Sequence, residues 1–242
     1  MNKFTFNFIT FFISTSILIA GNGIYDHSAF NKLLSKTVSN GKIKYSVFKS
    51  DTNFTNYLTS LEKAKPEDLS KNEQLAFWIN AYNACVIKNV LDNFGIKKPT
   101  DVKGFFDVKK FKIANKNLTL NEIENDIVRA KFKEPLVHFG LVCGAVSCPP
   151  IVNKVYTGKT VMAMLSTNAK NYLASSQNKL DEAKKTIYLS KIFEWYSKDF
   201  SDKKGEIEFL KKYGTKGMQD FIKVNTDVII DYMEYNWSLN GK

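Results

Sequence analysis

The sequence predicts an α+β fold: a single domain of helices packed around a small, mainly antiparallel sheet. The chain has 242 residues, of which 44% are hydrophobic and 14% aromatic, so it can bury a sizeable core. Helical and strand-like segments follow one another without the regular alternation that builds a parallel βαβ sheet. Internal repeats and low-complexity tracts are absent from the sequence. We therefore expect one globular domain over residues 23–242.

The regular elements follow from apolar periodicity and from the turn residues between them. A helix is predicted where apolar residues recur every three or four positions, and a strand where a short apolar run lies between turn residues. The expected helices span residues 26–38, 54–63, 71–93, 119–132, 159–175 and 206–213. The expected strands span residues 43–45, 111–114, 118–120, 136–142, 186–189 and 228–237.

Two capping boxes mark helix starts. Ser70 precedes Glu73 by three residues at the start of the longest helix, and Thr119 precedes Glu122 in the same way. The apolar run over residues 136–142 is interpreted as a buried strand, which leads into the loop that begins at Cys143. Loops at strand ends are where functional sites are built.

The first 22 residues have the pattern of a secretory signal peptide. Lys3 precedes an apolar run from Phe4 to Ala20 that contains no acidic residue. This run is shorter than the roughly 20 strongly apolar residues that span a bilayer comfortably, although an uncleaved N-terminal anchor is the alternative. No second long apolar stretch follows. We expect an exported protein, periplasmic or extracellular, whose mature chain has no transmembrane span.

The chain is strongly basic, with a formal net charge of +11. Its basic residues are spread as short lysine runs rather than one block, and no nucleic-acid-binding module is present, so no nucleic-acid partner is expected. Attraction to an acidic polymer or a membrane surface is the alternative, and it would weaken with salt. Arg129 is the only arginine among the 35 basic residues. Because only a guanidinium holds a carboxylate with two parallel hydrogen bonds, we expect a bidentate partner for it.

The central helix carries two amides within an apolar run. Asn80 and Asn83 lie three residues apart and therefore share a face, whereas Tyr82 belongs to an apolar face. A buried amide without a hydrogen bond costs about 1 to 3 kcal/mol, so both side chains must bind backbone, water or a ligand. The structural interpretation and the ligand-binding one both stay open.

One histidine is available for acid or base chemistry in the body of the domain. His27 is expected on a surface helix just after the signal, which leaves His138. A histidine in a buried segment is often a core residue that is satisfied through both ring nitrogens. His138 is therefore either a catalytic base or a structural residue.

Cysteine occurs three times. Cys85 faces the core of its helix and is expected to be an inert apolar residue. Cys143 and Cys148 either form a disulfide across a six-residue ring or provide a thiolate nucleophile, with His138 as its base and the amides of residues 144–147 polarising a carbonyl. Zinc on these two cysteines and His138 is a third alternative, but the spacing fits no paired motif. We expect no cofactor and no resident metal.

Several motifs resemble the domain of unknown function 547 family, in order from about Asp26 to Asn240. The matching segments are residues 74–83, 118–124 leading to Arg129, 137–144 with 147–149, Tyr156, 192–196 with Asp199 and Phe200, and 235–240. The resemblance implies an exported bacterial member of the family. Five residues match the family pattern, namely Glu124, Arg129, His138, Cys143 and Cys148, but the resemblance implies no activity. The family usually has a histidine where this chain has Asn125, which puts in doubt a scheme that needs a second imidazole or a metal there. An arrangement like that of papain-like or transglutaminase-like thiol enzymes is a fold-level analogy.

Two functions follow as hypotheses. The first is a cysteine-dependent amide hydrolase or acyl transferase that acts on a peptide-like or acidic envelope ligand, with Cys143 as nucleophile and His138 as base. Arg129 would pair with Glu124 or a substrate carboxylate. The expected substrate-binding residues are Asn80, Tyr82, Asn83, Glu124, Arg129, Ser147 and Cys148. The alternative is a noncatalytic envelope binding module, stapled by a Cys143–Cys148 disulfide, that holds an acidic or carbohydrate ligand with exposed Trp195 and Tyr196.

Overall fold

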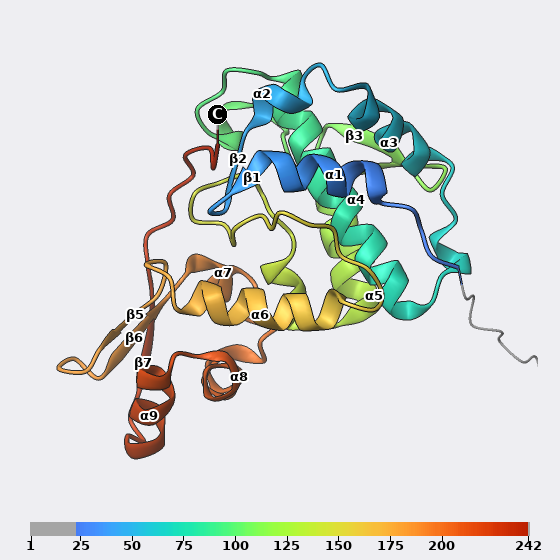
Figure 1. Ribbon diagram of the computed structural model, residues 1–242. Helices are drawn as coiled ribbons and strands as arrows, with labels where there is room; N and C mark the ends of the chain where they lie inside the picture. The colour runs from blue at the N-terminus through green and yellow to red at the C-terminus, as the bar shows by residue number, and fades with distance from the viewer. Residues whose placement is uncertain (1–22, 242) are drawn as a thin grey trace, which may run out of the picture.

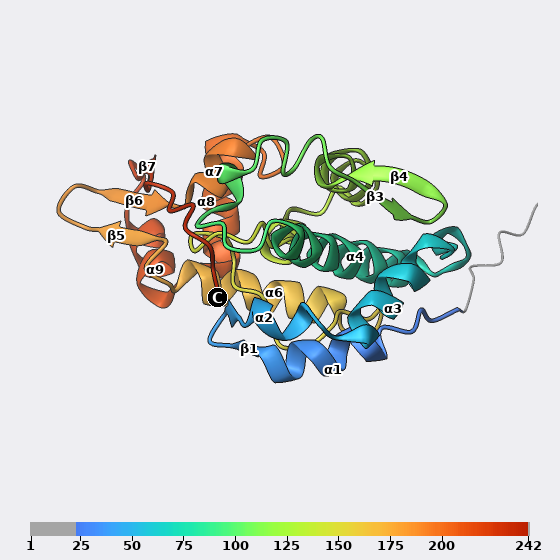
Figure 2. The ribbon, with the colours of Figure 1, turned by 90° about the horizontal axis from the view of Figure 1, so that it is seen from above.

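The computed structural model describes residues 23–241, so the signal peptide predicted for residues 1–22 lies outside the described residues. A central helix, α4 (Lys71–Asp92), organises the rest of the chain. Figures 1 and 2 show α1, α2 and α3 on one side of α4 and the β3–β4 hairpin on another, with α6 crossing beneath it. Most residues of α4 are buried, which suits a helix that is apolar on all sides.

The helices that surround α4 are short. The α-helices are α1 (Ser28–Thr37), α2 (Tyr45–Phe48), α3 (Thr52–Glu62), α5 (Ala130–Phe132), α6 (Val161–Leu173), α7 (Lys191–Trp195), α8 (Asp202–Tyr213) and α9 (Lys216–Val224). Three 3₁₀ turns are η1 (Pro66–Asp68), η2 (Pro99–Asp101) and η4 (Pro135–Phe139), and η3 (Glu122–Arg129) is a π-helix. Among residues 23–241, none of these helices combines the length and the apolar character needed to cross a membrane.

Within the described part of the chain, the strands form three small sheets at the edges of the helical core. These strands are β1 (Val38–Ser39), β2 (Lys42–Ile43), β3 (Lys110–Ile113), β4 (Lys116–Thr119), β5 (Lys179–Asp181), β6 (Thr186–Leu189) and β7 (Ile229–Tyr232). Both hairpins, β1–β2 and β3–β4, are antiparallel, as is β5–β6, whereas β7 pairs with β6 in parallel register. The prediction of a single α+β domain with mainly antiparallel strands is confirmed.

The two predicted capping boxes differ in how completely they form. At η3 both bonds are present: the Thr119 hydroxyl accepts from the Glu122 N–H at 3.1 Å, and the Glu122 carboxylate accepts from the Thr119 N–H at 2.7 Å. At α4 the Ser70 hydroxyl accepts from the Glu73 N–H at 3.4 Å, but the Glu73 carboxylate accepts from the Gly158 N–H instead. The helix predicted after Thr119 is therefore correctly placed, although it is wound as a π-helix over most of its length.

The buried strand predicted over residues 136–142 is wrong. Residues Pro135–Phe139 form the 3₁₀ turn η4, which begins where the Glu134 carboxylate accepts from the Leu136 N–H at 3.0 Å. The turn lies against α6 and η3, so nearly all of its side chains are buried. A short apolar run that is covered on every side does not distinguish a strand from a tight helix, and this is why the prediction failed.

Two other expectations also need correction. His27 is not on the surface: it is 4% exposed, and its Nδ1 shares a hydrogen bond of 2.6 Å with the Tyr57 hydroxyl. The closing strand predicted over residues 228–237 ends at Tyr232. Beyond β7 the chain crosses to the loop after Cys143 and finishes beside β2, where Gly241 pairs with Ile43 (Figure 1).

Candidate active site

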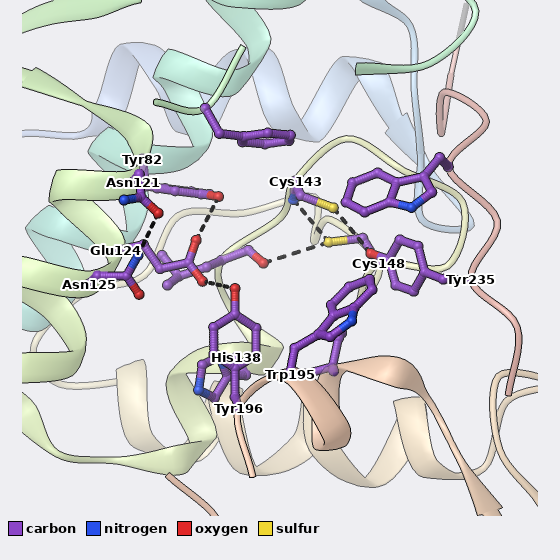
Figure 3. Close-up of a pocket in the computed structure, with 14 residues that line it drawn as sticks. Tyr82, Asn121, Glu124, Asn125, His138, Cys143, Cys148, Trp195, Tyr196 and Tyr235 are labelled. Atoms are coloured by element: carbon purple, nitrogen blue, oxygen red, sulfur yellow. Dashed lines mark hydrogen bonds between the residues drawn. The ribbon is translucent and has the colours of Figure 1, made fainter. Parts of the chain in front are cut away.

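A cavity of about 430 Å³ lies where α4, η3, η4, α7 and the C-terminal segment meet. Its walls are largely aromatic, formed by Tyr82, Phe106, Trp195, Tyr196, Tyr235 and Trp237. The polar groups that line it are Asn121, Glu124, Asn125, His138, Cys143 and Cys148. Figure 3 shows the two cysteines and Tyr235 on one side of the cavity and Tyr82, Glu124 and Asn125 on the opposite side. A partly enclosed, mostly apolar cavity with a few convergent polar groups is the usual form of a small-molecule site.

The loop that carries Cys143 is held from two directions. On the helix side, the Asn83 amide donates to the Gly140 carbonyl and accepts from the Val142 N–H, both at 2.9 Å. On the other side, the Gly144 carbonyl accepts from the Asn240 N–H at 2.9 Å. Gly144 has a φ of +87°, a conformation that favours glycine and lets the chain turn directly after the cysteine. The position of Cys143 is therefore set by α4 and by the end of the chain together.

The Cys143 thiol is surrounded by hydrogen-bond donors. Its Sγ lies 3.2 Å from the Tyr235 hydroxyl, and Cys148 lies beside it, with the Cys148 Sγ accepting from the Cys143 N–H at 2.9 Å (Figure 3). Hydrogen bonds from Cys148, from Tyr235 and from the Ala145 N–H outweigh desolvation and lower the pKa of Cys143. A lowered pKa favours the thiolate, which is the nucleophilic form.

Cys148 has the opposite character. It is 5% exposed, and burial raises its pKa well above the ordinary value, with the neighbouring Cys143 adding to the rise. All three cysteines are free thiols, so the disulfide considered for Cys143 and Cys148 is not formed in the structure. Cys85 is buried within α4, as expected, and burial also raises its pKa.

Glu124 faces the cavity from the opposite side. Its two carboxylate oxygens accept hydrogen bonds from the Tyr196 hydroxyl at 2.6 Å and from the Tyr82 hydroxyl at 3.0 Å. Burial and the nearby carboxylate raise the pKa of both tyrosines, so both stay protonated donors. The π-helix η3 carries Glu124 and Asn125 on its cavity side, and such wide helical turns often occur at functional sites.

Arg129 has the bidentate carboxylate partner that its uniqueness predicted, but that partner is Asp199 rather than Glu124. The Arg129 Nε and Nη2 donate to the two Asp199 oxygens at 2.6 and 3.0 Å, and Nη1 donates to Asn125. The guanidinium also lies 4.7 Å from the ring centre of Tyr196. Asp199 itself carries a pKa well below its usual range, because His138 and then Arg129 hydrogen-bond to it.

His138 points toward this ion pair rather than toward the cysteines. Its Nε2 lies 2.8 Å from the Asp199 carboxylate, its side chain is 2% exposed, and its ring stacks on Tyr196 with centroids 4.1 Å apart. His138 and Cys143 line the same cavity, as predicted, but the partners of Cys143 are Cys148 and Tyr235. A role for His138 as the direct base of Cys143 has no hydrogen bond to support it among the described residues.

Three of the predicted substrate-binding residues face the backbone instead of the cavity. The Asn80 amide donates to the Tyr156 carbonyl at 2.8 Å and accepts from its N–H at 3.0 Å, as Asn83 does for the cysteine loop. The Ser147 hydroxyl accepts from the Asn236 N–H at 2.9 Å and so fastens the C-terminal segment. The Val146 and Ser147 amides also donate to that segment, which takes them away from any substrate carbonyl.

The residues missed by sequence reasoning come from the C-terminal third of the chain. Tyr235 and Trp237 reach the cavity because the last segment pairs with the loop after Cys143. Trp195 is 47% exposed, in keeping with the binding-module alternative, and it stacks on Trp237 at 5.7 Å. Asp199, Tyr235 and Trp237 all lie in segments that resemble the family, and this resemblance was the one signal in the sequence that could have identified them.

Within residues 23–241, no group of three or more His, Cys, Asp or Glu side chains is placed to hold a metal ion.

Comparison with known proteins identifies a family but not an activity. Residues 66–173 match the family model described as "Protein of unknown function, DUF547". This segment includes Glu124, Arg129, His138, Cys143 and Cys148, and it stops before Asp199 and Tyr235. No curated protein and no solved structure matches the chain. Over residues 66–173 the chain is therefore similar to the DUF547 family.

Proposed function

We propose that this protein is an exported, cysteine-dependent acyl-transfer enzyme, either an amide hydrolase or an acyl transferase, with Cys143 as its nucleophile. The observation that carries the proposal is the thiol of Cys143: it opens into an aromatic cavity, and hydrogen bonds from Cys148, Tyr235 and Ala145 lower its pKa. Export is inferred from the signal-like pattern of residues 1–22. The substrate is a peptide-like acyl compound of a size that a cavity of about 430 Å³ can hold.

The reaction begins when the Cys143 Sγ attacks the substrate carbonyl carbon and forms a tetrahedral intermediate. The C–N bond then breaks, the departing nitrogen takes a proton from the Tyr235 hydroxyl, and a thioester remains on Cys143. Water or an acceptor amine attacks the thioester, returns one proton to the Tyr235 oxygen, and releases the thiolate, so that Cys143 and Tyr235 both regain their starting states. Tyr235 is assigned this role because its hydroxyl lies 3.2 Å from the sulfur.

His138 does not contact the reacting atoms in this scheme. It binds Asp199 and stacks on Tyr196, and the Tyr196 hydroxyl in turn binds Glu124. We therefore assign His138 and Asp199 a positioning role for the Glu124 side of the cavity. Replacing His138 by Gln, which retains a donor, would then preserve acylation of Cys143, whereas a direct base would be lost with the imidazole.

Acyl trapping tests the proposal. The full mature chain is reduced and treated with an activated aryl ester of an N-acylated amino acid, and the labelled residue is located by peptide mass spectrometry. A single thioester on Cys143, absent from Cys143→Ala and unchanged in Cys85→Ala, is the expected result. Labelling of Cys143 no faster than that of the buried Cys85 would exclude it as an acyl acceptor.

Thiol–disulfide exchange is a second candidate, favoured by the opposite pKa shifts of the two adjacent thiols. The Cys143 thiolate would attack an aromatic disulfide and release one arylthiolate. The Cys148 sulfur would then displace the second arylthiolate and close a Cys143–Cys148 bond. Two arylthiolates released per protein, against one for Cys148→Ser, would favour this function, whereas one for both proteins would exclude it.

A further inference from the structure

We infer that the cavity selects substrates that carry a positively charged amino group, which Glu124 binds. The inference concerns recognition, and only the orientation of the amine relative to Cys143 rests on the proposed function. It begins from an imbalance of charge. The chain has a formal net charge of +11, yet among residues 23–241 no lysine or arginine lines the cavity, and Glu124 is the only lining side chain with a permanent charge.

Arg129 is near enough to Glu124 for a Coulombic interaction but donates no hydrogen bond to it. Arg129 directs its Nε and Nη2 to Asp199 and its Nη1 to Asn125, so its three nitrogens are engaged elsewhere. The Arg129–Asp199 pair is neutral as a unit, and the Glu124 charge is left over. A carboxylate in a partly enclosed cavity favours a cationic ligand, since burial strengthens the Coulomb attraction between them.

Glu124 is also shaped to accept another donor. A carboxylate has about four acceptor positions, and the hydroxyls of Tyr82 and Tyr196 use one on each oxygen. Each tyrosine hydroxyl has one hydrogen, which it donates to Glu124. The two hydroxyls thus fix the orientation of the carboxylate and leave acceptor positions free for a ligand. An ammonium group, which has three donors and no acceptor, matches that capacity.

The aromatic walls support the same ligand class. Phe106, Trp195 and Trp237 line the cavity, and the faces of aromatic rings attract cations within about 6 Å of the ring centre. The same preference is already used beside the cavity, where the Arg129 guanidinium lies 4.7 Å from the Tyr196 ring centre. An acidic ligand, by contrast, would meet Glu124 and the Cys143 thiolate without a lining cation among the described residues.

A bound ammonium would also favour catalysis at the opposite side. Glu124 is close enough to Cys143 for its charge to oppose thiolate formation. A cation bound to Glu124 opposes that effect, so a substrate of the right charge would favour ionisation of the nucleophile that attacks it.

Binding of three matched peptide-like probes tests the inference. They are the Nα-acetyl methylamides of lysine, of Nε-acetyl-lysine and of glutamate, titrated against the full mature chain and followed by tryptophan fluorescence and calorimetry. The lysine probe should bind at least about tenfold more tightly than its acetylated form, which corresponds to 1.4 kcal/mol, and its affinity should fall with added salt. The glutamate probe should bind more weakly than both.

Two variants locate the preference. Glu124→Gln keeps one acceptor oxygen for a tyrosine hydroxyl, and its NH2 can donate to the oxygen of the other tyrosine; without the charge it should bind the lysine and acetyl-lysine probes about equally. Asp126→Asn removes an exposed carboxylate from the same π-helix outside the cavity and should retain the preference. Equal binding of the three probes to the native chain would overturn the inference, as would a preference that survives Glu124→Gln in protein with an unchanged melting temperature. Cys143→Ser separates the two proposals, because it abolishes acylation but should leave the charge preference intact.

Discussion

Changing Tyr235 to Phe should raise the pKa of the Cys143 thiol by roughly one to two units. The Tyr235 hydroxyl lies 3.2 Å from the sulfur and is the donor that the C-terminal segment contributes. A hydrogen bond to a charged group contributes about 1.5–3 kcal/mol, and one pKa unit corresponds to about 1.36 kcal/mol. Removing the hydroxyl withdraws that stabilisation from the thiolate and leaves the neutral thiol nearly unaffected, so the pKa rises.

The pH dependence of alkylation measures this shift. Reduced protein is exposed briefly to iodoacetamide across a pH series, and mass spectrometry gives the rate at Cys143 from the peptide that contains it. The midpoint of the rate should move to higher pH in Tyr235→Phe. Tyr232→Phe is the matched control, because the Tyr232 hydroxyl binds Glu206 rather than a cysteine. An unchanged or lowered midpoint would show that the Tyr235 hydroxyl does not stabilise the thiolate.

Three further predictions concern the residues that support the site. Burial lowers the pKa of His27 from 6.5 to about 4, so between these pH values the unfolded chain binds a proton that the folded chain does not. The free energy of unfolding should therefore fall as the pH drops from 6.5 to about 4. Urea unfolding at several pH values should show this dependence in the native chain and not in His27→Asn. Arg129→Lys should destabilise the protein by about 1–2 kcal/mol in urea, because an ammonium cannot reproduce the fork that holds Asp199. Asn83→Ala should cost about 1–3 kcal/mol and speed hydrogen exchange at Val142, whose N–H loses its acceptor.

Local chemistry predicted the longer helices α1, α3, α4 and α6 well, but it did not predict α7 or α9, and it was wrong for the apolar run before Cys143. Helix α4 begins at the Ser70 cap and ends within a residue of its predicted end, because caps and periodicity are properties of the local sequence. The run over residues 136–142 has no such local signal. Its form depends on α6 and η3, which cover it on several sides, and that information is not contained in the run itself.

The prediction of a carboxylate partner for Arg129 and the prediction that His138 is the base of Cys143 rested on different kinds of argument, and this explains their different outcomes. Arg129 was expected to hold a carboxylate because a guanidinium has a geometry that no lysine can supply, and the structure gives it such a partner in Asp199, 70 residues away. His138 was expected to serve Cys143 because it is the one histidine in the body of the domain and lies five residues before the cysteine. The 3₁₀ turn at Pro135–Phe139 and the Asp199 carboxylate direct the imidazole away from the cysteines. Tyr235, which lies 92 residues after Cys143 in the chain, is beside the sulfur instead. A requirement set by side-chain chemistry persists in any fold, whereas nearness along the chain becomes contact only if the backbone between the two residues allows it.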